Sequence, residues 1–311
     1  MTTQMVIPEV RTFADILQRA KAKAVQKRAK AVLLLPSSAE SIRAFMDASS
    51  AGLIEPRVIG SAANIRKLAE DYSLDIDRMS LIDIGQVEEA VTTAAGMANA
   101  GEIDFIVRGH IPVAELLTIL LKKENAFRLY GRKVSHVAVL KPEKYPKLLM
   151  LTDGGVMPQP DLKSKIHLIQ NLVFMSEALG IDNPRIAIVT AVEAIYLQMT
   201  ATLDAAILSK MAERGQIKGA RVDGPLSFDV AIDAFAASSK GIKDSSVAGQ
   251  ADAMVTSTIE VAQGIYNAMS LYGKCDIGGV IVGGRVPVAV NSWADSQAAR
   301  FNSILLAFLV S

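Results

Sequence analysis

Short, mostly apolar runs, each followed by apolar residues at helical spacing, recur along most of this 311-residue chain. Ala31–Leu35 precedes Ile42 and Phe45 in this way, and residues 103–109 precede Leu116. A strand that is apolar throughout, rather than alternately apolar and polar, is buried on both faces. The alternation therefore predicts an α/β fold in which helices cover both faces of a largely parallel sheet.

The composition narrows the range of partners. Half of the residues are apolar and 21% are charged, which is enough for a large core and for two domains. The 33 basic residues nearly balance the 32 acidic ones, so no overall field attracts nucleic acid or an anionic membrane. The apolar runs are also far shorter than the roughly 20 residues that span a bilayer. We expect neither nucleic-acid binding nor membrane insertion.

Cysteine usage and the N-terminal sequence suggest a location. Cys275 is the only cysteine, which excludes an intrachain disulfide, and the N-terminus lacks a basic-then-apolar secretory pattern. We therefore expect a cytoplasmic protein. No base lies near Cys275 in sequence, so we interpret it as a small apolar side chain rather than a nucleophile.

Several common catalytic and binding motifs are absent from the sequence. No two glycines are separated by one residue, which excludes the G-x-G of dinucleotide-binding folds. There is no Walker lysine motif, no G-x-S-x-G, no C-x-x-C and no H-E-x-x-H. We predict no metal site, because His110, His136 and His167 are too scattered to form one, and we interpret each as structural or superficial.

Small, polar or charged residues follow several of the predicted strands. Ligands of open α/β sheets bind at the carboxyl ends of strands, where glycine amides and helix N-termini favour anions. Arg108 or Arg285 would add a cation, so the pattern predicts a phosphate-bearing ligand. Each stretch is equally open to interpretation as an ordinary turn. The stretches are residues 105–110, 150–155, 221–229 and 288–295.

The two strand-like runs at residues 133–140 and 147–153 follow one another directly, which predicts a hairpin or a crossing between domains. After them a long helix is expected from Asp161 to Gly180, and the strand–helix series then resumes. We place a domain boundary near residue 150. The last helix is expected over residues 295–310.

A series of longer stretches carries a family resemblance over nearly the whole chain. They are "TFADILQRAK", "GLIEPRVIG", "VRGHIP", "GRKVSHVAVL", "LTDGGVMPQPDLKSK", "VDGPLSFDVAI", "KGIKDSSVAGQADAM" and "GVIVGGRVPVAVNSWADS". In order and spacing they make the chain similar to the phosphate acetyltransferase and phosphate butyryltransferase family, most closely to its butyryltransferase branch.

The resemblance implies an architecture and a reaction. The fold would be a two-domain three-layer α/β sandwich like that of isocitrate and isopropylmalate dehydrogenases, with the site in the interdomain cleft. Its C-terminal segment would return to the first domain, giving domains of residues 1–150 plus 290–311 and of residues 151–289. The reaction would move a short-chain acyl group between CoA and phosphate. No metal or redox cofactor would be required, since CoA is a substrate, and a homo-oligomer is expected because relatives assemble.

The resemblance also points to the final turn of the chain as the reactive one. The family has a serine followed by an arginine here, and this chain has Ser292 followed by Trp293, then Asp295. Tryptophan offers one N–H donor and no charge, whereas arginine offers a charged fork of donors. The aspartate proposed as catalytic in the acetyltransferase branch would lie at Ala299. We predict Ser292 and Asp295 as catalytic; the alternative for Asp295 is the N-cap of the last helix.

Other departures from the family leave the source of charge open. The family's "PDIEAGN" is "STIEVAQ" here, retaining Glu260, and Thr118 occupies a place where the family tends to carry an arginine. Arg285 or Arg300 would then supply the lost charge. The substrate-binding residues that we predict are Arg108, Gly109, Arg128, Thr152, Asp153, Gly154, Gly224, Glu260, Arg285 and Trp293.

Two other functions stay open at this point. A non-catalytic or weakly active paralogue that binds CoA or acyl phosphate is favoured by Trp293. An oxidoreductase on the related dehydrogenase architecture would need aspartates that converge on a metal, for which Asp153, Asp223 and Asp229 are the candidates.

Overall fold

The computed structural model describes residues 10–311 and divides into two compact units. The first unit comprises residues 16–136 and 277–311, and the second comprises residues 137–276 with residues 10–15. Residues 1–9, on which the expectation about a secretory pattern rests, lie outside the described part. Within residues 10–311, none of the helices combines the length and apolar character that a membrane span requires.

The first unit contains six strands in the order β3-β2-β1-β4-β11-β10. All neighbouring pairs are parallel except β11 with β10, which is antiparallel. The strands are β1 (Ala29–Leu34), β2 (Ile54–Gly60), β3 (Ser80–Asp83), β4 (Phe105–Arg108), β10 (Asp276–Val282) and β11 (Val288–Val290). The central β4 is buried along its whole length, as the uninterrupted apolar run predicts.

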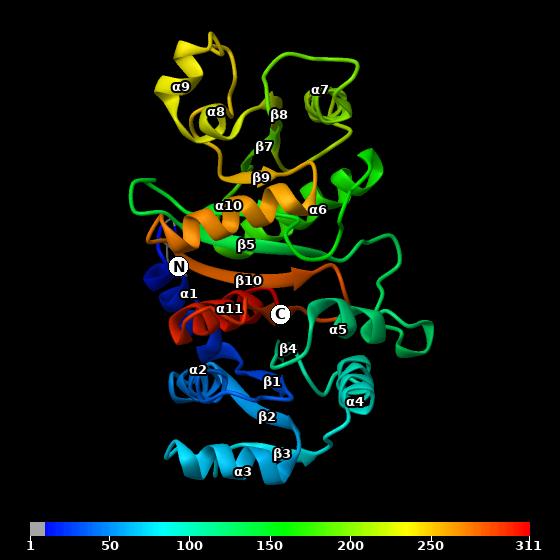
Figure 1. Ribbon diagram of the computed structural model, residues 1–311, viewed down its shortest axis with the longest axis vertical. Coiled ribbons are helices and arrows are strands. Elements are labelled where there is room, and N and C mark those ends of the chain that lie inside the picture. Colours follow the sequence, from blue (N-terminus) through cyan, green and yellow to red (C-terminus); the bar gives the residue numbers. More distant parts are fainter. Residues whose placement is uncertain (1–9) are drawn as a thin grey trace, which may run out of the picture. The chain divides into compact units, whose positions relative to one another are not determined.

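Helices cover both faces of these strands, with α2 and α11 on one face and α4 and α5 on the other (Figure 1). Ser38 and Ser61 begin α2 and α3 by accepting the backbone N–H groups of Ser41 and Asn64, so a serine hydroxyl caps each helix. The helices are α1 (Phe13–Gln26), α2 (Ala39–Ser50), α3 (Ala62–Asp71), α4 (Val87–Asn99), α5 (Val113–Leu120), the 3-10 turn η1 (Lys123–Asn125) and α11 (Gln297–Leu309).

The second unit contains five strands in the order β5-β6-β9-β7-β8. The pair β5 and β6 is antiparallel and the remaining pairs are parallel. Asp161 and Gly180 cap the longest helix, α6, at the two residues predicted from the sequence. The elements are β5 (Ser135–Lys141), β6 (Leu149–Thr152), α6 (Leu162–Leu179), β7 (Arg185–Val189), α7 (Thr200–Glu213), β8 (Arg221–Leu226), α8 (Phe228–Ile232), α9 (Ala234–Ser239), β9 (Ala253–Val255) and α10 (Ile259–Leu271).

The unit boundaries differ from the domain boundaries near residues 150 and 290 that the sequence indicates. The chain passes between the two units at 136/137 and at 276/277. A boundary at either predicted position would instead separate the two strands of an antiparallel pair. Ala138 of β5 pairs with Leu151 of β6, which keeps that hairpin in the second unit. Gly279 of β10 pairs with Val290 of β11, which keeps this pair in the first.

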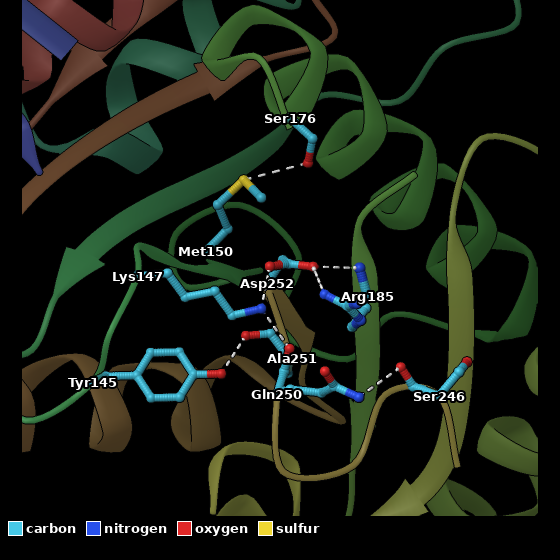
Figure 2. Close-up of polar contacts among 9 residues, drawn as sticks. All are labelled: Tyr145, Lys147, Met150, Ser176, Arg185, Ser246, Gln250, Ala251 and Asp252. Carbon is cyan, nitrogen blue, oxygen red and sulfur yellow. Dashed lines mark hydrogen bonds and ion pairs between the residues drawn. The ribbon is translucent and has the colours of Figure 1, made fainter. Parts of the chain in front are cut away.

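A buried carboxylate joins three segments of the second unit, as Figure 2 shows. Asp252, which is 6% exposed, lies just before β9 and forms ion pairs with Lys147 and Arg185. It also accepts the backbone N–H of Arg185 at 2.8 Å. Beside it, the Tyr145 hydroxyl donates to the Ala251 carbonyl at 2.6 Å. These contacts tie the β5–β6 turn to β7 and β9 at the amino ends of the strands.

We expect Asp252→Ala to lower the free energy of unfolding by about 3 kcal/mol, because it leaves two cations of a largely buried network without their partner. Asp182→Ala is the matched control. Asp182 is exposed and has no hydrogen-bond or ion-pair partner within residues 10–311, so its change should stay within about 0.5 kcal/mol. Urea denaturation measures both, and equal effects would mean that the network adds no stability.

Candidate functional site

The carboxyl ends of β4 and β11 meet at one edge of the first unit because the two strands are parallel neighbours. Arg108, the last residue of β4, is 6% exposed. Its Nη2 donates to the carbonyl of Asn291, just beyond β11, and its Nη1 donates to the Ile111 carbonyl at 2.6 Å. The two strand ends are thereby fastened together. We call the surrounding residues the Ser292 site: Arg108, Gly109, His110, Ser292, Trp293, Asp295 and Arg300.

Gly109 is required by the close approach of this loop to β1. A Cβ at Gly109 would lie 2.0 Å from the Leu34 carbonyl oxygen and 2.6 Å from that of Leu35. The next residue, His110, donates its backbone N–H to the Leu35 carbonyl at 3.0 Å. The missing side chain therefore lets the chain turn at the edge and sets the position of His110.

A tight turn follows β11 and leads into α11. The Ser292 backbone N–H donates to Asp295 Oδ2 at 2.7 Å, and the Asp295 N–H donates to the Ser292 carbonyl at 3.1 Å. The side chain of Ser296, not that of Asp295, accepts from Ala299 at the helix N-terminus. The alternative that Asp295 caps the last helix is therefore wrong, because its carboxylate bonds back to Ser292. The last helix accordingly begins at Gln297 rather than at residue 295.

The aromatic rings of Trp293 and His110 stack on one another across this edge. Their centroids are 4.7 Å apart and the ring planes differ by 21°. Trp293 is 55% exposed, and His110 is exposed as well. Hence the turn is open to solvent rather than sealed by apolar side chains, as a site for a soluble ligand requires.

Two guanidinium groups lie at the same edge. Arg300, on the first turn of α11, donates to the Trp293 carbonyl at 3.1 Å and to Ser41 Oγ at 3.4 Å. Burial, and with it repulsion from Arg300, lowers the pKa of Arg108 to about 10, and Asp295 opposes both effects. The Nε atoms of both arginines are buried without a hydrogen-bond partner. Two cations face one carboxylate here, and an anion would relieve their repulsion.

The other predicted arginines of the first unit lie elsewhere. Arg285 precedes β11 by three residues, whereas Ser292 follows it by two, so the strand separates them. Gly284 forms an isolated bridge with Arg128, and Arg285 donates its N–H to the Phe127 carbonyl at 2.8 Å. Of the two arginines that the sequence offers as the source of the lost charge, only Arg300 lies at the Ser292 site.

In the second unit, the predicted residues after β6 form a compact loop. Asp153 is 1% exposed, and its carboxylate accepts backbone N–H groups from Gly155 at 2.8 Å, Val156 at 2.9 Å and Met157 at 3.2 Å. Its main visible role is to hold the loop. The Gly154 carbonyl accepts from Gln263 of α10.

Gly224 and Glu260 lie at different places in the second unit. Gly224 lies inside β8, where a Cβ would come within 2.9 Å of Ile188, so the strand needs a glycine for packing. Glu260 is exposed on the first turn of α10, and a hydrogen bond from Thr258 lowers its pKa. The substrate-binding roles of these two residues, and those of Thr152, Asp153 and Gly154, stay predictions.

The aspartates proposed for a metal-dependent oxidoreductase do not converge. Asp229 bonds to Ser227 at 2.5 Å and pairs with Lys240 at 3.0 Å, and these two contacts lower its pKa to about 2. Asp223 instead accepts from Ser209 at 3.3 Å and from Ser245. Across residues 10–311, no group of three or more histidine, cysteine or acidic side chains is arranged to hold a metal ion.

Sequence reasoning did not assign His110 to the site, and it named Arg300 only as one of two options. Both residues come from segments that the sequence marks: His110 lies two residues after Arg108, and Arg300 lies one helical turn after Ser296. The signal that was available for His110 is its place directly after a strand whose end is already predicted to bind ligand.

Comparisons with known proteins agree on one family. The pattern of the family described as phosphate acetyl/butaryl transferase matches residues 85–308. The phosphate butyryltransferase of Clostridium acetobutylicum is 37% identical, over 97% of this chain and 99% of its own length. The phosphate acetyltransferase of Rickettsia felis is 34% identical, over 96% of this chain and 84% of its own.

Solved structures show the same similarity at the level of the fold. A branched-chain phosphotransacylase from Enterococcus faecalis V583 superposes with a TM-score of 0.79 at 25% identity, covering 91% of this chain and 98% of that one. The EutD phosphotransacetylase of Staphylococcus aureus gives a TM-score of 0.75 at 19% identity, with 96% and 99% covered. The chain thus has the mixed α/β fold of these proteins.

We expect Gly109→Ala to lower the free energy of unfolding by about 3 kcal/mol, because its Cβ would overlap the Leu34 carbonyl oxygen. Gly96→Ala is the matched control. Gly96 lies in the interior of α4, and no neighbouring group lies within 4 Å of where a Cβ would be. Alanine there should raise the free energy of unfolding by about 0.5 to 1 kcal/mol. Urea unfolding of both variants tests this, and a neutral Gly109→Ala would show that the loop is free to move away.

Proposed function

Because this chain belongs to the phosphate acetyl/butyryl transferase family, we propose that it transfers a short-chain acyl group between CoA and phosphate at the Ser292 site. In the forward direction a phosphate oxygen attacks the carbonyl carbon of an acyl-CoA thioester, the C–S bond breaks, and acyl phosphate and free CoA result. Butyryl is the acyl group that we favour, because two of the relatives found are phosphate butyryltransferases.

The observation that carries the proposal is the pair of guanidinium groups beside an exposed serine turn. Phosphate is dianionic near neutral pH, and the tetrahedral intermediate adds a further negative charge on the carbonyl oxygen. Arg108 is held rigidly by two carbonyls, and Arg300 is held by the Trp293 carbonyl. Both arginines are therefore oriented before an anion arrives, which reduces the cost of reorganisation. Ser292 supplies a hydroxyl donor on the same turn.

Trp293 stands in the place where the family resemblance expects an arginine. Its carbonyl accepts from Arg300 Nη2 at 3.1 Å, so a guanidinium lies beside the turn although residue 293 itself carries no charge. We propose that Arg300 supplies the charge that arginine at 293 would have given. With Arg300 in this role, the site keeps the positive charge that the transfer reaction needs, which favours an active transferase.

Finer parts of the proposal come from the resemblance. They are an isocitrate-dehydrogenase-like three-layer sandwich with a cleft that holds the site, a cytoplasmic location, a homo-oligomeric assembly and no requirement for a metal or redox cofactor. Substrate contacts by Thr152, Asp153, Gly154, Gly224 and Glu260 belong to the same set of proposals. So do contacts by Arg128 and Arg285, at places distinct from the Ser292 site.

A second function is favoured by one observation, the loss of arginine at position 293. A paralogue that binds CoA or acyl phosphate without turnover would keep Arg108 and the open turn and lose only the reactive group. The two functions differ in a single measurable property, the phosphate dependence of thiol release.

We expect the purified chain to release free CoA thiol from butyryl-CoA only when inorganic phosphate is present, because phosphate is the nucleophile. A thiol-reactive dye measures the release continuously, and butyryl phosphate is measured as its hydroxamate. Tight binding of butyryl-CoA with no release at any phosphate concentration would support the binding paralogue instead.

We expect Arg300→Met to lower kcat/KM for phosphate by about 100-fold, because one charged donor to the anion is lost. Arg78→Met is the matched control, since Arg78 lies on an exposed loop before β3 and has no hydrogen-bond or ion-pair partner in the described chain; its rate should stay within about twofold. A loss in Arg285→Met with none in Arg300→Met would assign the charge to the other arginine.

A further inference from the structure

His110 is the one imidazole at the Ser292 site, and the transfer reaction needs a base there. In the direction that makes acyl-CoA, a CoA thiol must lose its proton before it attacks acyl phosphate. A thiol of this kind resembles the cysteine thiol, with an ordinary pKa of about 8.5, so a base close to neutrality is well matched to it. Resting on the proposed function, we infer that His110 is the general base for this thiol.

The groups that would otherwise serve as base are committed elsewhere or absent. The place of the acetyltransferase aspartate is Ala299, which is 5% exposed and donates its N–H to Ser296. The carboxylate of Asp295 accepts the Ser292 N–H at 2.7 Å and holds the turn closed. Asp295 therefore positions Ser292, and the proton acceptor is a different residue.

The geometry of His110 suits this role. Its backbone is fixed by the 3.0 Å bond to the Leu35 carbonyl, and its ring is held by the stack on Trp293. Neither ring nitrogen has a hydrogen-bond or ion-pair partner within residues 10–311. Since His110 is exposed, a nitrogen can meet a thiol that approaches from solvent. Trp293 thus gains a function: it orients the base.

The charged and titratable groups around this edge come from several neighbouring elements. They include Arg108 at the end of β4, Asp295 on the turn, Arg300 on α11, and Glu40, Arg43 and Asp47 on α2. His136 of β5 also interacts with Arg108, but burial, with repulsion from Arg108, lowers its pKa to about 4 and so keeps it neutral near pH 7. The two arginines stabilise the thiolate once it forms and the phosphate that leaves. Glu40 is exposed on the helix, and Asp295 bonds to the turn.

The proton follows a closed path. A ring nitrogen of His110 takes the proton from the thiol, and the sulfur electron pair forms the C–S bond at the acyl carbon. The C–O bond to phosphate then breaks, its electron pair leaves with phosphate, and the imidazolium returns the proton to that oxygen. In the acyl phosphate-forming direction, the imidazolium protonates the departing thiolate.

The test measures kcat/KM for acyl-CoA formation from butyryl phosphate and CoA as a function of pH. We expect the wild-type kcat/KM to rise with pH through one ionisation, because only the neutral imidazole accepts the thiol proton. In His110→Gln the rate should fall by about 10² to 10³ and this ionisation should disappear. His167→Gln, the same change on α6 of the second unit, is the matched control and should keep both rate and profile.

A second variant separates chemistry from folding. His110→Ala leaves space for added imidazole. We expect added imidazole to raise the rate of this variant at least about tenfold, in proportion to the concentration of neutral imidazole. A merely structural stack would give no such rescue. If kcat/KM of His110→Gln stayed within about threefold of the wild-type value and its pH profile kept the ionisation, the inference would be overturned, but the proposed transferase function would remain. A wild type without phosphate-dependent turnover would overturn both.

Discussion

The parallel pairing of β11 with β4 is the constraint on which the rest of the site depends. It brings two loops that are distant in sequence to the same edge, so that Arg108 of one strand end bonds to the carbonyl of Asn291 at the other. The absence of a side chain at Gly109 then allows the first loop to cross β1 closely. The stack of His110 on Trp293, which joins the two loops, follows from these two facts. A shift in this register would separate the serine turn from Arg108.

Features encoded locally were predictable from the sequence. The two ends of α6 depend on residues a few positions away along the chain, so Asp161 and Gly180 were identified without tertiary information. The buried parallel strands were equally evident, because double-sided burial leaves an apolar run. The α/β fold follows from these two signals alone.

Features that depend on strand direction were not predictable. Residues 277–290 look like one apolar stretch with glycines in its middle, yet they form the antiparallel pair β10 and β11. The reversal at Gly283 and Gly284 sends Arg285 to one end of β11 and Ser292 to the other. Without that turn, Arg285 and Arg300 are equivalent candidates in the sequence. Ser296 was likewise indistinguishable from Asp295 as a helix cap, since both residue types are good caps.

The crossings of the chain at residues 136 and 276 have a consequence for its biosynthesis. The second unit is complete once residue 276 has left the ribosome, whereas the first still lacks β10, β11 and α11. Until then β4 is an edge strand that pairs only with β1, and the apolar residues that α11 later covers are exposed to solvent. During synthesis the second unit can therefore fold before the first is complete. Residues 277–311, the last 35 residues, then complete the first unit and cover its exposed sheet edge and apolar face.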